Sequence, residues 1–325
     1  MERERKATLV LFLVSFVWGM TFIWMEQALR AANSTVPELE DRWVVMHFVA
    51  GRFIIATFLA LILLPQTRRG FSNSKTLKGG AWLGLIVGAG YMTQMIGLTD
   101  ASVTPAVSAF ITSLYVVFTA IIGVFLGRQA LTMWTIIGIF LATFGAGWIS
   151  GPPQIEFGWG EWLTVIGAYI FGAHIIATDR VTKQVDPLQA TGPMMVTIVI
   201  SAGTILSLSI LQGGNEEIYS SLVELSLDFD YFIPLLLCGS LGSLFALGAL
   251  NYYQRDISPV RAALVYAFEP VWAGIVSLLL GFEGEVTMWL FIGAGALLLG
   301  NIIVELEEVM DQIFRKKSQH QKIGD

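Results

Sequence analysis

The stretch that decides the fold runs from Gly79 to Gly127, GGAWLGLIVGAGYMTQMIGLTDASVTPAVSAFITSLYVVFTAIIGVFLG, and Asp100 is its only charged residue. A helix of roughly 20 mostly apolar residues crosses a hydrocarbon core about 30 Å thick. The stretch is therefore long enough for two membrane-spanning helices, joined by a hairpin turn between Thr99 and Ser102. It predicts an all-α, polytopic membrane protein.

The composition of the whole chain agrees with this class. Of 325 residues, 55% are hydrophobic and 14% are charged, whereas soluble domains carry about 25% charged residues. The apolar residues lie in uninterrupted runs rather than in alternating or heptad patterns. This excludes a collagen, a coiled coil, a disordered tail and a nucleic-acid binder. The single cysteine, Cys238, excludes an internal disulfide.

Charges, prolines and glycine clusters cut the chain into ten apolar segments. The first follows basic residues as a signal peptide does, but it ends in Trp24-Met25-Glu26-Gln27 without a small-residue cleavage pattern, so we interpret it as a span. The expected spans are 7–29, 45–64, 79–99, 102–126, 131–150, 159–179, 188–211, 231–253, 258–281 and 286–304.

The basic residues indicate how these spans are oriented, because Lys and Arg in short loops favour the cytoplasmic side. With the N-terminus inside, all of the 19 basic residues except Arg30, Arg42 and Arg52 fall on the cytoplasmic side. An odd number of spans would spoil this segregation. We therefore expect a multi-pass protein of the cell (inner) membrane with both termini in the cytoplasm.

An internal repeat relates the two halves of the chain. Thr132-Met133-Trp134 recurs as Thr287-Met288-Trp289, an offset of 287 − 132 = 155. The fifth and tenth spans thus look like copies, and Trp18-Gly19 of the first span aligns with Phe171-Gly172 of the sixth. Since five is odd, the second copy must cross the membrane in the opposite sense. We expect two inverted five-helix repeats, residues 1–150 and 151–325, the second ending in a cytoplasmic tail, with the binding site between them.

Several motifs carry a family resemblance over nearly the whole chain. They are Phe16-Val17-Trp18-Gly19-Met20-Thr21-Phe22, Gly51-Arg52-Phe53, Leu126-Gly127-Arg128-Gln129-Ala130-Leu131-Thr132, Asp186-Pro187 and Glu269-Pro270-Val271-Trp272-Ala273. Together they resemble the drug/metabolite transporter superfamily, EamA type. The sequence departs from that pattern at Glu26 and Arg128. The resemblance implies ten helices, alternating access and export of amino acids or similar metabolites.

Ionisable groups inside the spans are the first candidates for a site, because a charge at the centre of a membrane helix costs about 2.5 to 3.5 kcal/mol on insertion scales. Glu269 lies near mid-membrane, next to Pro270. We expect it to line the cavity and to bind a proton or a cationic group; the alternative is a neutral acid bonded to a neighbouring helix. His174 is either a cavity or a packing residue. Arg52 is expected at the outer side as a structural anchor, paired with Glu26 or Glu40.

Aromatic and hydroxyl side chains at helical spacing complete the expected cavity wall. Ser108, Thr112, Tyr115 and Thr119 form a polar stripe on the fourth span, although such hydroxyls often bond only their own backbone. The candidate substrate-binding residues are Trp18, Thr21, Tyr91, Gln94, Thr112, Tyr115, His174, Tyr252, Tyr266, Glu269 and Trp272.

The function expected from these features is a secondary, non-ATP transporter that exports amino acids or similar small metabolites. No nucleotide-binding motif, catalytic constellation or metal-ligand spacing is visible, so we expect neither an enzyme nor a cofactor. Expected partners are a metabolite, the bilayer and protons as coupling ion; the chain acts as a monomer or a homodimer. The alternatives are a nucleotide-sugar or organic-phosphate exchanger, and a non-transporting receptor or channel.

Overall fold

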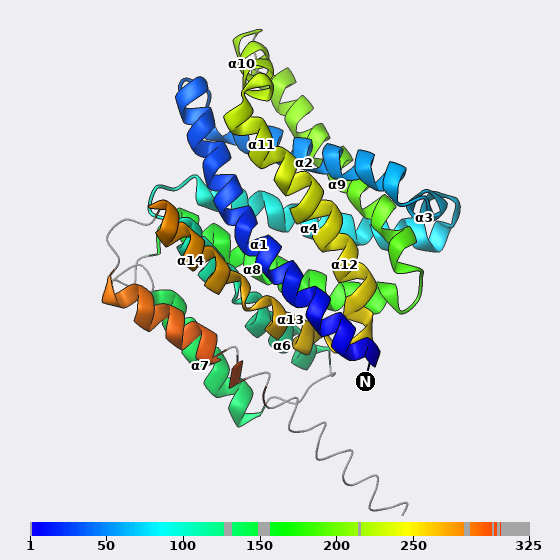
Figure 1. Ribbon diagram of the computed structural model, residues 1–325, viewed down its shortest axis with the longest axis vertical. Helices are drawn as coiled ribbons and strands as arrows, with labels where there is room; N and C mark the ends of the chain where they lie inside the picture. The colour runs from blue at the N-terminus through cyan, green and yellow to red at the C-terminus, as the bar shows by residue number, and fades with distance from the viewer. Residues whose placement is uncertain are drawn as a thin grey trace, which may run out of the picture.

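The computed structural model is a bundle of helices (Figure 1). It describes residues 2–126, 132–148, 157–213, 216–282, 287–300, 302–303 and 306, and it contains no strand within these ranges. The longer helices are α1 (Glu2–Thr35), α2 (Asp41–Leu63), α4 (Ser74–Leu98), α7 (Met133–Trp148), α8 (Trp159–Thr182) and α9 (Pro187–Gly213). Shorter ones are α3 (Gln66–Arg69), η1 (Gly70–Ser72), α5 (Pro105–Thr112), α6 (Tyr115–Phe125), α10 (Glu216–Leu227), α11 (Phe229–Leu237), η2 (Cys238–Phe245), α12 (Ala246–Tyr253), η3 (Gln254–Asp256), α13 (Pro259–Tyr266) and α14 (Glu269–Leu280).

The expected class, an all-helical polytopic membrane protein, is confirmed. By length and composition, seven helical segments of the described ranges can cross a membrane, and two shorter apolar helices, Glu269–Leu280 and Met288–Gly300, add to them. Each of the ten expected stretches contains a helix. The boundary between the expected repeats at 150 and 151, the segment around Arg128 and the C-terminal tail beyond 306 lie outside the described residues.

Side-chain caps explain where several helices begin. The expected hairpin turn after Thr99 is present, and the Thr104 hydroxyl beyond it accepts a hydrogen bond from the Val107 amide, which caps α5. Asp186 accepts a hydrogen bond from the Gln189 amide in the same way, and Pro187 opens α9. The Asp186-Pro187 motif is therefore a helix start.

Two spans are broken near their middles. The fourth consists of α5 and α6, with a turn at Ser113 and Leu114, and the ninth consists of α13 and α14, with a turn at Ala267 and Phe268. The breaks lie at an offset of 267 − 113 = 154, close to the register of the sequence repeat. Irregular backbone at membrane depth is tolerated where it is buried in protein or lines a cavity.

Glycines set the closest helix contacts. α4 lies against α8 and α9, and a methyl group on Gly84 of α4 would overlap the carbonyl oxygen of Met194 on α9. α7 packs against the helix Met288–Gly300, where the rings of Trp148 and Trp289 are 5.1 Å apart. Small residues allow such approaches between helices in lipid.

We expect Gly84→Ala to destabilise the protein, because the added methyl group meets backbone rather than a movable side chain. Overpacking of this kind costs about 1 to 3 kcal/mol. The measurement is the thermal unfolding midpoint of the purified protein in detergent. Gly203→Ala on α9 is the matched control, because no described atom outside its own helix backbone and chain neighbours lies within 4 Å of the added Cβ. Equal midpoints for the two variants would contradict the tight packing of α4 on α9.

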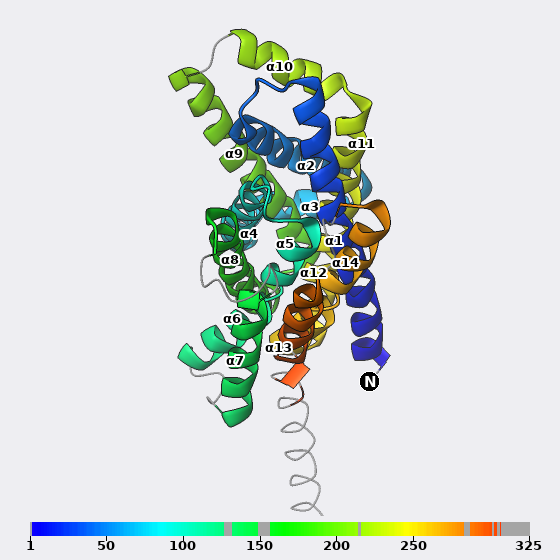
Figure 2. The ribbon, with the colours of Figure 1, turned by 90° about the vertical axis from the view of Figure 1, so that its left-hand side faces the viewer.

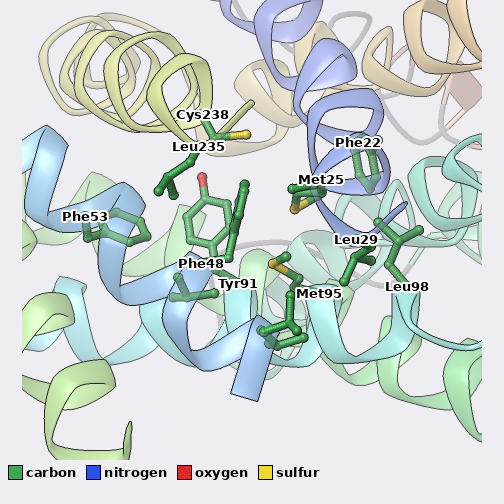
Figure 3. Close-up of a cluster of buried hydrophobic side chains, with 14 of the residues drawn as sticks. Phe22, Met25, Leu29, Phe48, Phe53, Tyr91, Met95, Leu98, Leu235 and Cys238 are labelled. Atoms are coloured by element: carbon green, nitrogen blue, oxygen red, sulfur yellow. The ribbon is translucent and has the colours of Figure 1, made fainter. Parts of the chain in front are cut away.

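The larger of two hydrophobic clusters fills the space between α1, α2, α4 and α11. Figure 3 shows Phe22 and Met25 of α1 with Tyr91 and Met95 of α4 among its side chains. The smaller cluster joins the first half of α1, including Leu11 and Val14, to residues of α12 and α13, which lie beside α1. Figures 1 and 2 place α10 at the opposite end of the molecule.

Candidate functional site

A cavity of about 40 Å³ lies at the junction of the two hydrophobic clusters. Helices from both halves of the chain contribute to it, and it has room for a few water molecules. The lining residues are Trp18, Thr21, Val87, Tyr91, Gln94, Thr112, Tyr115, Phe171, His174, Ile175, Leu247, Leu250, Tyr266 and Glu269.

Most residues expected at a site are brought together here. Those on the lining are Trp18, Thr21, Tyr91, Gln94, Thr112, Tyr115, His174, Tyr266 and Glu269. The structure places the other two elsewhere. The Tyr252 ring packs against Tyr253 and the Arg255 guanidinium, and Trp272 packs against Phe12 and Phe16. Substrate binding by the lining residues stays a prediction.

The lining residues that the sequence did not single out are apolar: Val87, Phe171, Ile175, Leu247 and Leu250. One sequence signal could have found Phe171, because it faces Trp18 in the internal repeat, at an offset of 171 − 18 = 153. The remaining four are aliphatic residues in apolar helices, and nothing in the sequence separates them from ordinary packing positions.

Glu269 supplies the carboxyl group of the cavity. It is the first residue of α14, at the break of the ninth span, and it is 6% exposed. The Tyr115 hydroxyl, on the first residue of α6, donates a long hydrogen bond of 3.5 Å to Oε2. Glu269 thus both lines the cavity and bonds a neighbouring helix. An uncompensated buried charge is costly. A proton would neutralise the carboxylate here, and a cationic group of a ligand would pair with it.

Hydrogen bonds fix the polar side chains of the wall. Gln94 donates through Nε2 to the Thr112 hydroxyl, at 3.2 Å, and so ties α4 to α5. Tyr266 donates to Oε1 of Gln254, which donates through Nε2 to the carbonyl oxygen of Ile175. His174 is 2% exposed, and its Nε2 lies 3.3 Å from the Thr178 hydroxyl on the same helix. The wall is therefore preorganised from several helices.

A π-helical segment, η2, holds two polar groups next to the cavity. Trp18 donates through Nε1 to the carbonyl oxygen of Gly242, at 3.1 Å, and the Trp18 ring meets the Tyr266 ring at 5.1 Å. Arg52 donates through Nε to the Ser243 hydroxyl, at 2.9 Å. π-Helical turns occur frequently at functional sites, and this one positions residues of α1 and α2.

The expectation for Arg52 was wrong. α2 begins at Asp41 rather than at residue 45, so Arg52 lies in the middle of the helix, 1% exposed, and not at an outer edge. It pairs with neither expected partner, because Glu26 pairs with Arg30 and Glu40 with Arg42. A charged side chain is therefore buried close to the cavity.

The two halves contact one another through matching glycines. A methyl group on Gly19 of α1 would lie 2.8 Å from the carbonyl oxygen of Glu269 and 2.7 Å from Cβ of Trp272, both on α14. On Gly172 of α8 it would lie 3.0 Å from the carbonyl oxygen of Tyr115 and 3.0 Å from Cβ of Phe118, both on α6. Each half thus presents a glycine to the broken helix of the other half.

The lining repeats this pairing. Twelve of its fourteen residues match between the halves, at offsets from 171 − 18 = 153 to 250 − 94 = 156. The pairs are Trp18 with Phe171, Thr21 with His174, Tyr91 with Leu247, Gln94 with Leu250, Thr112 with Tyr266, and Tyr115 with Glu269. The two carboxyl oxygens and the imidazole of this lining come from the second half.

Comparison with other proteins agrees with the architecture. The chain is 27% identical over 301 residues to an uncharacterized transporter of Archaeoglobus fulgidus. The alignment covers 92% of this chain and 86% of the relative. A crystal structure with 16% identity aligns over 93% of this chain and 97% of its own, with a TM-score of 0.57, which shows a common fold. The EamA-like transporter family matches residues 5–151 and 158–306, in two units. Because these matches span most of the chain, the protein belongs to the EamA-like transporter family.

Proposed function

We propose that this membrane transporter is a secondary, alternating-access exporter of amino acids or similar small metabolites, which it binds in the cavity around Glu269. The observation that carries the proposal is the cavity itself, whose wall is built from paired positions of the two halves. Binding sites of inverted-repeat transporters lie at the interface between the repeats.

Three features support an arrangement of two inverted five-helix repeats, 1–150 and 151–325. The contacts of Gly19 on α14 match those of Gly172 on α6. The breaks in the fourth and ninth spans lie in the same register. The lining residues pair between the halves. A pseudo-two-fold axis between the halves produces such matches, because each half then contacts the other through equivalent residues.

The small size of the cavity supports alternating access. About 40 Å³ holds a few water molecules but not a metabolite. Both glycine contacts are tight at once. The cavity is too small for a metabolite while the two halves are packed this closely, so in this proposal a substrate binds only after one half moves against the other.

The lining favours a small zwitterion over a phosphorylated substrate. Its described residues offer one carboxyl group, an imidazole, hydroxyls and aromatic rings, and none of them is a lysine or an arginine. Dianionic nucleotide sugars and organic phosphates call for several cationic side chains. In this proposal Glu269 binds the substrate's amino group or a coupling proton. The protein lies in the cell membrane with both termini in the cytoplasm.

Reconstitution tests the proposal. Proteoliposomes that hold only the purified chain should transport at least one labelled amino acid, without ATP, with a rate that saturates and is reduced by unlabelled substrate. Exchange of nucleotide sugars or organic phosphates without any amino-acid flux would favour the exchanger. Absence of saturable flux over a broad panel of metabolites would favour a receptor.

A further inference from the structure

Arg52 is a buried cation without an anionic partner. It is 1% exposed, and none of the carboxylates in the described part of the chain forms an ion pair with it. Taking such a charge out of water costs several kcal/mol. A buried charge of this kind in an apolar helix needs a reason beyond packing.

The hydrogen bonds of the guanidinium leave one edge free. Nε is satisfied by the Ser243 hydroxyl. Nη1 has only the Met25 sulfur at 4.0 Å, a weak acceptor, and Nη2 has no hydrogen-bond partner. The Nη1 and Nη2 groups together form the fork that binds a carboxylate in a bidentate manner. This fork carries no strong acceptor.

The fork lies directly behind the cavity wall. The guanidinium carbon is 4.4 Å from the centre of the Tyr91 ring, which lines the cavity and holds the guanidinium plane. A methyl group on Gly242 would meet both Nη2 of Arg52, at 3.1 Å, and the Thr21 methyl group, at 2.5 Å. Thr21 and Tyr91 thus separate Arg52 from the cavity in this conformation. The fork therefore reaches a substrate only if Thr21 or Tyr91 moves aside.

The other half of the molecule shows that packing alone does not require an arginine. A methyl group on Gly239 would meet the carbonyl oxygen of Arg52 and Cβ of Ile55. On Gly84 it would meet the carbonyl oxygen of Met194 and Cβ of Thr197. Met194 therefore occupies the position equivalent to Arg52, and it is fully buried. A methionine fills this place in one half, whereas the other half carries a charge.

We propose that Arg52 is the specificity residue for the substrate's carboxylate, which it binds through Nη1 and Nη2 while Glu269 faces the cationic end. The inference rests on the proposed function and narrows its substrates to carboxylate-bearing metabolites. A carboxylate would supply the counter-charge that none of the described residues provides.

The test compares neutral L-amino acids with their amides, which lack only the negative charge. Ligand binding to the folded protein raises its thermal unfolding midpoint, so each compound is titrated against the purified protein in detergent. Wild-type protein should bind at least one acid at least about tenfold more tightly than its amide. Arg52→Met should remove that difference and leave affinity for the amide within about twofold.

Arg52→Met copies the residue at the equivalent position, so the variant is expected to fold at least as well as the wild type. Arg52→Lys keeps the charge but not the fork, and should also lose most of the preference for the acid. Arg42→Met is the matched control, an exposed arginine on the same helix; it should bind like the wild type.

Several results would overturn the assignment of Arg52. One is a wild-type protein without preference for any acid over its amide. Another is a preference for the acid that survives in both Arg52→Met and Arg52→Lys. A third is a chloride salt that raises the unfolding midpoint of the wild-type protein as much as the acid does. If the protein transports amines or phosphates and shows no preference for acids over amides, the role of Arg52 is contradicted but secondary transport is not. If acids bind through Arg52 but no solute crosses the proteoliposome membrane, transport fails and the carboxylate site remains.

Discussion

Glu269→Gln is expected to reduce flux driven by a proton gradient at least tenfold and to remove the pH dependence of the remaining flux. The substitution keeps the shape of the side chain and a group that can accept the Tyr115 hydrogen bond. It removes the only carboxyl group among the described residues of the cavity lining, and with it the group proposed to exchange a proton for the substrate's cationic end. The measurement is uptake of labelled substrate by proteoliposomes over a series of pH values.

Glu26→Gln is the matched control for this experiment. Glu26 lies on α1, forms an ion pair with the exposed Arg30 and does not line the cavity around Glu269. It should therefore retain the wild-type pH profile, and equal unfolding midpoints would show that both variants are folded. If Glu269→Gln transports with unchanged pH dependence, Glu269 takes no part in coupling and its role is to bond α6.

The cavity could largely be predicted from the sequence because its polar residues contrast with apolar helices. Glu269, His174 and Gln94 stand out in spans where a polar side chain is costly, and repeat symmetry directed attention to the same helices. Leu247 and Leu250 could not be found, because a leucine that faces a cavity looks like one that faces lipid.

The position of Arg52 could not be predicted correctly, because clusters of charged residues mark the expected helix ends. The cluster from Glu38 to Arg42 was assigned to a loop, although α2 starts within it at Asp41. Four additional residues add about 6 Å of helix before Arg52, which places Arg52 at the middle of α2 rather than near its start. The break between α5 and α6 was also not predicted, since neither Ser113 nor Leu114 is a helix breaker.

Gly19 and Gly172 make the sharpest test of the inverted repeat. The first allows α1 to approach α14, and the second allows α8 to approach α6, with the same backbone and Cβ atoms in contact. In an inverted repeat the two membrane faces are exchanged by the pseudo-two-fold axis. We therefore expect one of these two glycine contacts to loosen when the transporter opens to one side, and the other to loosen when it opens to the opposite side.

Gly19→Val and Gly172→Val should each lower transport at least tenfold, because the new side chain meets backbone of a helix that must close over the substrate. They should also trap opposite states. With Cys238 replaced by Ser and a cysteine placed at Thr112 on the cavity lining, a membrane-impermeant thiol reagent should label one variant mainly from outside and the other mainly from inside. Gly248→Val is the matched control, because no described atom outside its own helix backbone and chain neighbours lies within 4 Å of its added Cβ, and it should be labelled like the parent protein. Labelling of both glycine variants from the same side would contradict the inverted arrangement, since two copies that cross the membrane in opposite senses cannot be forced open towards the same face by equivalent changes.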